Sequence, residues 1–336
     1  MLYHTIKWPT ICRHNYILFK KSFLTFFAYI YTGGVIYMTG KSETLLLLES
    51  LAIRMASNEQ LEKYLMREGK GHTGERQLLN ELKKLNTEHM ILSDLYFETH
   101  SGQKFQIDHL LVIGNVLFIY EVKNYEGEWN YGNELFTKGT NFSCPNPLIQ
   151  LTRTKNCFKQ FLQDLSLANC EVKAAVVFIN SHFTLFNVPV GKPLLLPTQI
   201  HHHIQTMDQF PPITDSLRVV VQELLRNKAK AEPFRKNIPL YRFEELKKGI
   251  RCRACGDIVV PLNTKFYRCS NCSSTGNVTQ AILDAAREFQ LLFPNMKLTV
   301  SSLYEWCGKS CAKQRFSNVL TANFIAQGKY RGTYYL

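Results

Sequence analysis

The chain has 336 residues, of which 45% are hydrophobic, 12% aromatic and 20% charged. This length suits two or three folding units, and the composition excludes a chain kept disordered by high charge. The formal net charge of +13 favours a polyanionic partner, because neutralising phosphates releases counterions. Nucleic acid is the first candidate, and an anionic membrane surface is the second. We find no phosphate-binding glycine loop and no nucleophile elbow, so no nucleotide cofactor is predicted.

The cysteine pattern indicates a reducing compartment. Of the ten cysteines, four form two Cys-x-x-Cys pairs and several others occur singly. That pattern is typical of a single metal site and not of an extracellular disulfide framework. The predicted location is the cytoplasm.

The N-terminal residues 1–37 carry four basic residues and no acid, and residues 22–38 are uncharged and largely apolar. A run of about 17 residues is the lower limit for a membrane-spanning helix, so a membrane anchor through residues 22–38 is the alternative location. Its flanking lysines would send the remainder outside, where a reduced cysteine site fits poorly. We therefore favour an apolar basic leader outside the native fold, with Met38 as the candidate start.

The helices and strands of the central region follow from hydrophobic periodicity. Residues 38–70 are predicted to be a helical N-terminal segment that ends at the break Gly69-Lys70-Gly71, and a new helix is predicted to open at Gly74. Strands, a helix and a last strand then complete an α/β core over residues 71–210. Their apolar centres indicate a mixed sheet covered on both faces. The predicted strands are 91–98, 105–114, 116–125 and 173–180, and the helix between the last two is 147–166.

Residues 211–249 are predicted to be a helix and a basic linker, since ten Lys or Arg oppose three Glu over residues 226–255. A cysteine module follows at 250–275. The tail, residues 276–336, shows helix, tight turn, helix and β segment, an order that resembles a winged helix-turn-helix whose second helix enters the major groove. Lys313 and Arg315 are candidate contacts there, although paired amphipathic helices are also common without any DNA-binding role.

Three charged residues stand out in the apolar strands. Asp108 lies in one strand, and Glu121 and Lys123 share one face of the next. A tight turn near residues 114–115 would bring the acids close together, where two carboxylates favour Mg²⁺ or Mn²⁺. A lysine beside such a cation suits phosphodiester hydrolysis. Spacing alone leaves open a structural salt bridge between Glu121 and Lys123, with Asp108 capping a bend.

A family resemblance adds to this. The runs GHTGERQLL (71–79), FQIDHLLVIGN (105–115), LFIYEVKNYEGEW (117–129) and NPLIQLTR (146–153) resemble the nuclease-related domain, or NERD, family. That family is grouped with the restriction-endonuclease-like PD-(D/E)XK superfamily, so the resemblance implies a restriction-endonuclease-like mixed sheet flanked by helices.

The resemblance also assigns roles within the expected catalytic set. It implies that Asp108 and Glu121 are metal carboxylates, that Lys123 is the catalytic lysine, and that Glu75 and Gln150 match the family's helix glutamate and glutamine. The structural alternatives are a helix-dipole role for Glu75 and simple surface polarity for Gln150 and Arg153. Arg153 is also a candidate phosphate contact. His109 should point away from Asp108 and is interpreted as a packing residue.

The two cysteine pairs predict a structural metal site. Four thiolates at this spacing suit tetrahedral Zn²⁺ in a ribbon, and metal binding would supply much of the folding free energy. Arg251 and Arg253 lie close by and are candidate nucleic-acid contacts. The predicted ligands are Cys252, Cys255, Cys269 and Cys272.

The sequence therefore predicts a metal-dependent nuclease acting on nucleic acid, with DNA favoured, joined to a Cys₄ zinc ribbon and a small helix-turn-helix-like domain. The alternative is a catalytically inactive nucleic-acid-binding protein that uses a nuclease-like fold as a platform. A membrane partner is expected only if the leader is native.

Overall fold

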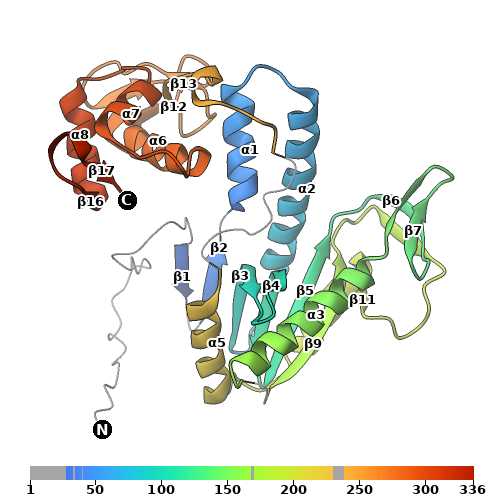
Figure 1. The fold of residues 1–336 in the computed structure, drawn as a ribbon. Helices are drawn as coiled ribbons and strands as arrows, with labels where there is room; N and C mark the ends of the chain where they lie inside the picture. Colours follow the sequence, from blue (N-terminus) through green and yellow to red (C-terminus); the bar gives the residue numbers. More distant parts are fainter. Residues whose placement is uncertain (1–27, 33–34, 40, 168–169, 230–237) are drawn as a thin grey trace, which may run out of the picture. The chain divides into compact units, whose positions relative to one another are not determined.

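A computed structural model describes residues 28–32, 35–39, 41–167, 170–229 and 238–336, with residues 28–39 and Arg331 described by their backbone alone (Figure 1). The chain divides into two compact units, and each is described by itself. The sheet unit is residues 1–40 with 73–230. The cysteine unit is residues 41–72 with 231–336. The leader predicted at residues 1–37 lies mostly outside the described residues.

The sheet unit contains a seven-stranded mixed sheet in the order β1-β2-β3-β4-β5-β9-β11. Strands β3, β4 and β5 form an antiparallel meander, and β9 lies parallel to β5 because a helix connects the two. β11 continues the sheet parallel to β9, and β2 joins β3 in parallel through the pair Tyr37 and Ile91. The strands are β1 (Ala28–Thr32), β2 (Val35–Thr39), β3 (His89–Glu98), β4 (Lys104–Ile113), β5 (Val116–Lys123), β9 (Glu171–Phe178) and β11 (Leu194–Leu195).

Helices cover both faces of this sheet, as the continuous apolar strands predict (Figure 1). On one face α3 (Pro147–Asp164) and α5 (Asp215–Asn227) share a core with Leu117 and Ile119 of β5. On the other face the end of α2 and α4 (Ile200–Met207) pack on the intervening residues of the same strand. This alternation decides which side chains of β5 meet α3 and which meet α2.

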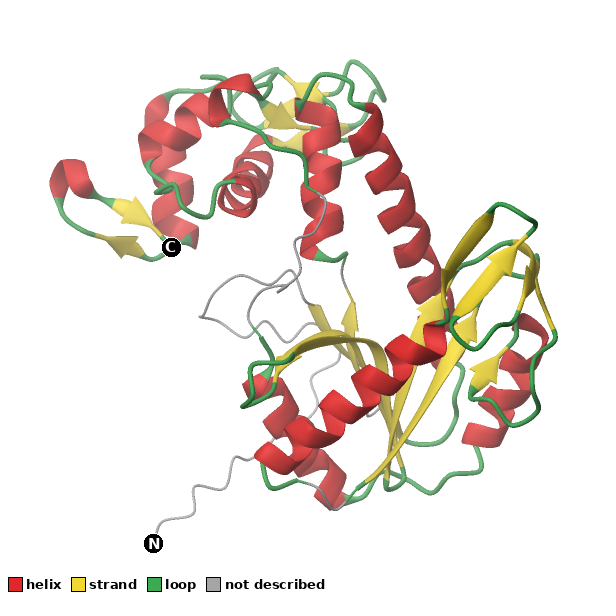
Figure 2. Cartoon of the chain, turned by 45° about the vertical axis from the view of Figure 1, so that its right-hand side comes forward, coloured by secondary structure: helices red, strands yellow, loops and turns green. Residues whose placement is uncertain are grey.

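A second sheet of four short strands, in the order β10-β6-β7-β8, stands beside the main sheet (Figure 2). The sequence pattern does not predict this sheet, because each strand has only four residues and carries little alternation. Trp129 and Phe136 are buried beneath it and join the α3 core. The strands are β6 (Gly127–Asn130), β7 (Leu135–Lys138), β8 (Phe142–Pro145) and β10 (Phe183–Phe186).

The predicted helix break at Gly69-Lys70-Gly71 is wrong. After α1 (Glu43–Arg54), a single helix α2 (Glu59–Leu82) runs through both glycines. Each glycine costs about 1 kcal/mol in a helix interior, but neither one forces the chain out of helical geometry. Leucines buried near both ends of α2, Leu61 and Leu78, hold the flanking turns, and this packing outweighs the local propensity.

The cysteine unit joins residues 41–72, which were expected to form a segment of their own, to the C-terminal part of the chain. Arg54 of α1 is fully buried, pairs with Glu288 of α6 (Val278–Leu292) at 2.6 Å and lies over the Trp306 ring at 3.9 Å. Arg251 pairs with the same carboxylate at 2.8 Å. Two arginines therefore compensate one buried acid and hold the pKa of Glu288 below its usual value, against the effect of its own burial.

The remaining elements of the cysteine unit are two small hairpins, two further helices and a terminal hairpin. The two small hairpins precede these helices in the chain. The elements are β12 (Ile250–Arg251), β13 (Ile258–Val259), β14 (Phe266–Arg268), β15 (Thr275–Asn277), α7 (Val300–Trp306), α8 (Lys313–Asn323), β16 (Ala326–Gln327) and β17 (Tyr334–Tyr335), with 3₁₀ turns at Phe243–Glu245 and Tyr330–Gly332. A further 3₁₀ turn, Pro197–Gln199, precedes α4 in the sheet unit.

The apolar run predicted as an alternative membrane anchor, residues 22–38, is described only in part. Within it the chain forms the antiparallel strands β1 and β2, and residues 22–27 lie outside the described residues. In the part of the chain that the structure covers, none of the helices combines the length and apolar character needed to cross a bilayer.

Candidate functional site

The site begins where β4 separates from β5. Their ladder ends at the pair His109 and Tyr120, whereas β5 stays paired with β9 as far as Lys123. The amide of Val122 donates to Oδ2 of Asp108 at 2.8 Å. The Asp108 side chain therefore takes the place of a strand partner at the mouth of the fork, and its carboxylate is held beside the end of β5.

Glu121 and Lys123 converge with Asp108 on the α3 side of this fork. Nζ of Lys123 donates to Oε1 of Glu121 at 2.6 Å and to Oε1 of Gln150, on α3, at 3.1 Å. The salt bridge of the structural alternative thus exists, but it lies against Asp108 and Gln150 and is not isolated at a strand end. An ammonium group has three protons, so one donor of Lys123 remains for a ligand.

Glu75 approaches from the opposite face, on α2. A Cβ atom added at the preceding residue, Gly74, would lie 2.9 Å from Cβ of Asn124 and 3.1 Å from Ile179. Only glycine lets the helix pass so close to the strand ends. Nε2 of His109 donates to the main-chain carbonyl of Glu75 at 2.8 Å, and its Nδ1 accepts from the Ser93 hydroxyl at 2.7 Å.

Electrostatics link these groups. Burial and the neighbouring carboxylates of Glu121 and Glu75 raise the pKa of Asp108 well above its usual value. Burial alone would lower the pKa of Lys123, but the carboxylates of Glu121 and Asp108 raise it above normal. Burial raises the pKa of Tyr125 to about 12, although the Lys123 charge opposes this. Lys123 therefore stays charged at neutral pH, and an excess of negative charge gathers around Asp108.

The site is open on one side. The Lys123 side chain is 18% exposed and that of Glu121 is 4% exposed, whereas Gln150 is exposed and Asp108 and Glu75 are partly buried. The structure gives no hydrogen bond to Oδ1 of Asp108 or to Oε2 of Glu121 among the residues it describes. These two oxygens have free lone pairs, and neighbouring negative charge raises the pKa of Asp108. Such a pair of oxygens fits a hard divalent cation. No third acid comes close enough to complete a three-residue ligand cluster in the described chain, so water and phosphate oxygens would fill the other positions.

A groove runs beside α3. It has a volume of about 1140 Å³ and is lined by residues of the β3–β4 turn, of α3, of the loop between β6 and β7 and of the segment before β11, with amide and hydroxyl groups among its lining side chains. Arg153, predicted as a phosphate contact, is exposed on its wall. Gln150 lies one helical turn from Arg153, so α3 contributes both a wall of the groove and the glutamine that contacts Lys123.

Three residues have contacts in the site that the sequence does not predict. His109 is buried, as its interpretation as a packing residue predicts, and it also ties β4 to the Glu75 turn of α2. Tyr125 stacks on Trp129 and its hydroxyl accepts from the Cys144 thiol at 3.6 Å, close enough to Lys123 for their charges to interact. Gly74 allows the close helix approach. In the sequence, the one signal for these contacts is the histidine directly after the strand aspartate, which the structure shows to be buried.

The other predicted nucleic-acid contacts lie in the cysteine unit, and several already have partners. Arg251 donates to Gly256, Ser50 and Glu288, and Arg253 pairs with Asp284 at 3.0 Å. Arg315 donates to the Thr264 carbonyl and, at 2.9 Å, to the Thr279 hydroxyl. These three side chains bind within their own unit. Lys313 is exposed beside the Tyr304 ring.

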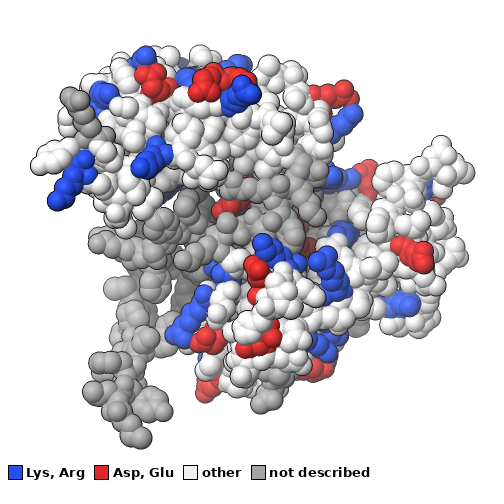
Figure 3. All heavy atoms as spheres, viewed as in Figure 1, with Lys and Arg blue, Asp and Glu red and all other residues white. Residues whose placement is uncertain are grey.

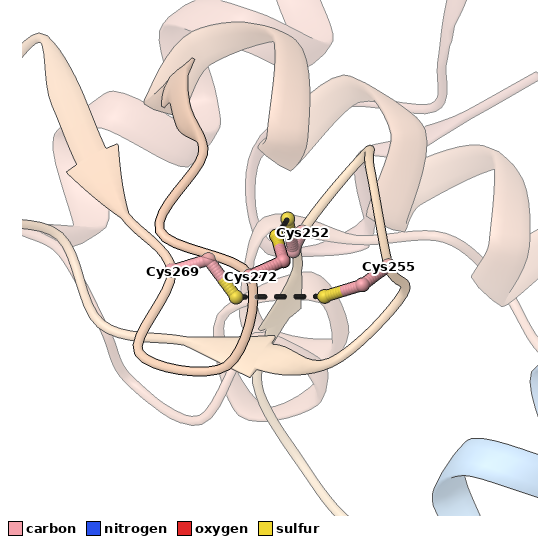
Figure 4. A group of neighbouring side chains, drawn as sticks. All are labelled: Cys252, Cys255, Cys269 and Cys272. Atoms are coloured by element: carbon pink, nitrogen blue, oxygen red, sulfur yellow. Dashed lines mark hydrogen bonds between the residues drawn. The ribbon is translucent and has the colours of Figure 1, made fainter.

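The four cysteines of the two knuckles point toward a common centre (Figure 4). Their sulfur atoms all lie within 4.8 Å of one another, with Cys252 and Cys272 at 3.7 Å and Cys255 and Cys269 at 3.5 Å. Zn–S bonds of about 2.3 Å in a tetrahedron separate the sulfurs by about 3.8 Å. The donor set and its spacing therefore suit a four-thiolate metal ion.

One comparison with known proteins covers the region of the carboxylate–lysine centre. No solved structure matches the chain significantly. An uncharacterised protein of Bacillus anthracis is 28% identical over 145 residues, a match that covers 39% of this chain and 66%, or just under two thirds, of that protein. The model of the nuclease-related domain family matches residues 70–179, which include Asp108, Glu121, Lys123, Glu75 and Gln150.

Proposed function

We propose that the chain is a metal-dependent nuclease that hydrolyses phosphodiester bonds of nucleic acid, with DNA as the favoured substrate. The observation that carries this proposal is the meeting of Asp108, Glu121 and Lys123 at the fork between β4 and β5. Surplus negative charge with free oxygens lies directly beside a charged amine there. The match of residues 70–179 to the nuclease-related domain supports it.

Each residue then has a distinct role. Asp108 and Glu121 would hold Mg²⁺ or Mn²⁺ through the oxygens that are not hydrogen-bonded within the site. Such a cation, when bound, polarises a phosphodiester oxygen and lowers the pKa of a bound water. Lys123 keeps one donor for the attacking water or a phosphate oxygen, and Gln150 holds its ammonium group in place. Glu75 adds negative charge and would contact the cation through water.

The fold that we propose for the sheet unit is the restriction-endonuclease-like PD-(D/E)XK arrangement. It is supported by the mixed sheet with helices on both faces and by the order of aspartate, Glu-x-Lys and a following helix glutamine. We assign Zn²⁺ to the cysteine quartet, where a closed four-thiolate set leaves no position for a reacting water. Its role is then to stabilise the cysteine unit.

The test is cleavage of plasmid, single-stranded DNA and RNA by the full chain, with Mn²⁺ or Mg²⁺ against EDTA. Lys123→Met and Asp108→Ala should each lower the rate at least about 100-fold, because each removes a charge that acts in the transition state. The chain offers a matched control on the neighbouring strand. Lys173 and Glu171 form the same two-residue-spaced ion pair, at 3.4 Å, at the other end of β9.

The control variant Lys173→Met should cleave like the wild type. Metal-dependent cleavage that survives in Lys123→Met would refute the assignment of the site. Salt-sensitive binding of nucleic acid with no cleavage in any metal would instead favour the inactive platform.

A further inference from the structure

The last three helices and the terminal hairpin of the cysteine unit form a connected arrangement. In chain order they are α6, an extended residue Leu298, α7, α8, β16 and β17. β16 pairs antiparallel with β17, and the amide of Tyr335 donates to the carbonyl of Leu298 at 2.8 Å. The segment between the first two helices thus adds an edge to the terminal hairpin. This order of three helices and a closing hairpin resembles that of a winged helix-turn-helix.

The two helices of the turn are rigidly joined. Gly308 and Lys309 both have positive φ values, 64° and 56°, within the six-residue turn that joins α7 to α8. Leu303, Phe316 and Leu320 are fully buried between the helices. The orientation of α8 is therefore set by a packed core, as a helix that reads DNA requires.

The outer face of α8 carries small polar side chains. Gln314, Asn318 and Thr321 follow one another at helical spacing and are all exposed, and Nε2 of Gln314 donates to Oδ1 of Asn318 at 3.0 Å. Amide side chains can form paired hydrogen bonds with adenine in the major groove. Arg315 faces away from this row, because its guanidinium group is bonded to Thr264 and Thr279.

The hairpin tip is exposed. Tyr330 follows Lys329 and begins the 3₁₀ turn that ends at Gly332. It has a φ of 55° and is 93% exposed. The Thr333 hydroxyl donates to the Tyr330 carbonyl at 2.9 Å, and the Gly332 amide donates to the Lys329 carbonyl at 3.1 Å. Figure 2 shows this single turn at the far end of the hairpin, extended away from the helices. An aromatic ring held out by a structured turn is suited to contact a partner.

Charge selects the kind of partner. Residues 306–336 contain five Lys or Arg and no Asp or Glu. Figure 3 shows basic and no acidic side chains at the left-hand edge of the cysteine unit, where α8 and β16 lie in Figure 1. Lys309 is partly neutralised by Glu305 at 3.3 Å, whereas Lys313 and Lys329 are exposed beside the polar row and at the tip. This surface is complementary to a phosphate backbone.

The geometry points to a duplex-DNA-binding surface on the cysteine unit that is separate from the carboxylate–lysine centre. The outer face of α8, with Gln314 and Asn318, enters the major groove, and Lys313 contacts phosphate beside it. The β16–β17 tip, with Lys329 and Tyr330, contacts the sugar–phosphate backbone of the DNA beside this groove. B-form DNA fits this description because its major groove admits a helix, whereas the deep, narrow major groove of A-form RNA does not. This inference deepens the proposed function by specifying duplex DNA, but binding does not depend on cleavage.

The experiment is a fluorescence-anisotropy titration of the full chain with a mixed-sequence 30-base-pair DNA duplex. Cleavage during the titration is prevented in one of two ways: by supplying Ca²⁺ without a chelator, or by introducing each variant together with Lys123→Met. The helix variant is Gln314→Ala with Asn318→Ala, and the tip variant is Lys329→Ala with Tyr330→Ala. The matched control is Lys63→Ala on α2, which removes one exposed lysine of the same unit that is paired with Glu59. Circular dichroism and zinc content establish that each variant is folded.

We expect each double variant to weaken duplex binding by about ten-fold or more and Lys63→Ala to change it less than two-fold. Loss of Lys329 should also lower the slope of log K against log salt by about 0.9, because one phosphate contact disappears. Equal weakening in the tip variant and in Lys63→Ala would overturn the inference, since net charge alone would then explain binding. Tighter binding of an RNA duplex or of anionic vesicles would overturn it as well.

The two proposals fail separately in this design. If Lys123→Met binds duplex DNA like the wild type and wild-type cleavage is absent, only the nuclease proposal fails. If cleavage depends on Lys123 while both double variants bind duplex DNA normally, only the winged-helix surface fails.

Discussion

The amide of Val122 donates a 2.8 Å hydrogen bond to the carboxylate of Asp108, at the point where β4 leaves β5. A backbone group that would otherwise lack a strand partner is thereby satisfied by a side chain. The same bond fixes Asp108 beside Glu121 and Lys123 of the neighbouring strand. A local irregularity of the sheet thus creates the candidate site, and its electrostatic strain leads to the first prediction.

Asp108→Asn should stabilise the protein while abolishing metal-dependent cleavage. The amide oxygen still accepts from Val122, but the charge that burial, Glu121 and Glu75 disfavour is gone. We expect the free energy of unfolding at pH 7.5, in EDTA, to rise by about 0.5–2 kcal/mol, as when strain at a functional site is relieved. Urea denaturation measures it.

The pH dependence of this difference follows from the raised pKa of Asp108. An acid with a raised folded pKa binds its proton more tightly when folded, so wild-type stability falls as pH rises from the unfolded value, about 4, to the folded one. Asp108→Asn lacks this decline. If the two proteins unfold at the same urea concentration at both pH 4 and pH 7.5, the charge on the Asp108 carboxylate does not destabilise the folded protein.

Glu75→Gln should move the acid limb of activity to lower pH. Cleavage needs ionised Asp108, and Glu75 is one of the charges that raise its pKa. Removing that charge lets Asp108 ionise at a lower pH, although the plateau rate also falls as one carboxylate is lost. The measurement is the pH profile of the cleavage rate at a limiting Mn²⁺ concentration, where protons compete with the cation for the metal-free site. Glu81→Gln, further along α2 and paired with Lys84, is the control that should leave the midpoint unchanged.

Gly74→Ala and Gly71→Ala should act in opposite directions. A methyl group at Gly74 meets Asn124 at 2.9 Å, so α2 must move away and displace Glu75, with a cost of about 1–3 kcal/mol and a lower cleavage rate. At Gly71 nothing lies within 4 Å, and alanine should stabilise the helix by up to about 1 kcal/mol with normal activity. Thermal unfolding and rates are compared. Equal behaviour of the two variants would show that the close approach at Gly74 is not needed.

Cys269→Ser should abolish the binding of Zn²⁺ to the cysteine unit. Its sulfur is one of four within 4.8 Å, and three thiolates hold the ion less tightly. Native mass spectrometry should show one zinc ion in the wild type and none in this variant, which should also unfold at a lower temperature. Cys311→Ser is the control, because this cysteine lies outside the quartet. Loss of zinc in Cys311→Ser as well would contradict the four-ligand assignment.

Short-range sequence patterns explain why several residues of the candidate site could be predicted without the structure. The alternation of a strand puts Glu121 and Lys123 on one face, and two Cys-x-x-Cys pairs define a ligand set, because both relations depend only on spacing within a few residues. The apolar strand centres likewise predicted a sheet covered on both faces, which the two cores around β5 confirm.

Relations between distant segments were not visible in the same way. The continuation of α2 through Gly69 and Gly71, the link from His109 to the Glu75 carbonyl, and the burial of Arg54 against Glu288 each depend on which elements pack together. The partner of Arg315 also lies in another segment, so its availability for DNA was not readable from its charge.

The amino-acid sequence by itself determined which chemical groups this protein has and which of them share a strand face or a knuckle, because those relations follow from backbone periodicity. The tertiary structure alone decided the fork between β4 and β5, the approach of Glu75 and Gln150 from opposite faces, and the edge that Leu298 adds to the terminal hairpin. These depend on packing and hydrogen bonding between segments far apart in the chain, for which local spacing carries no information.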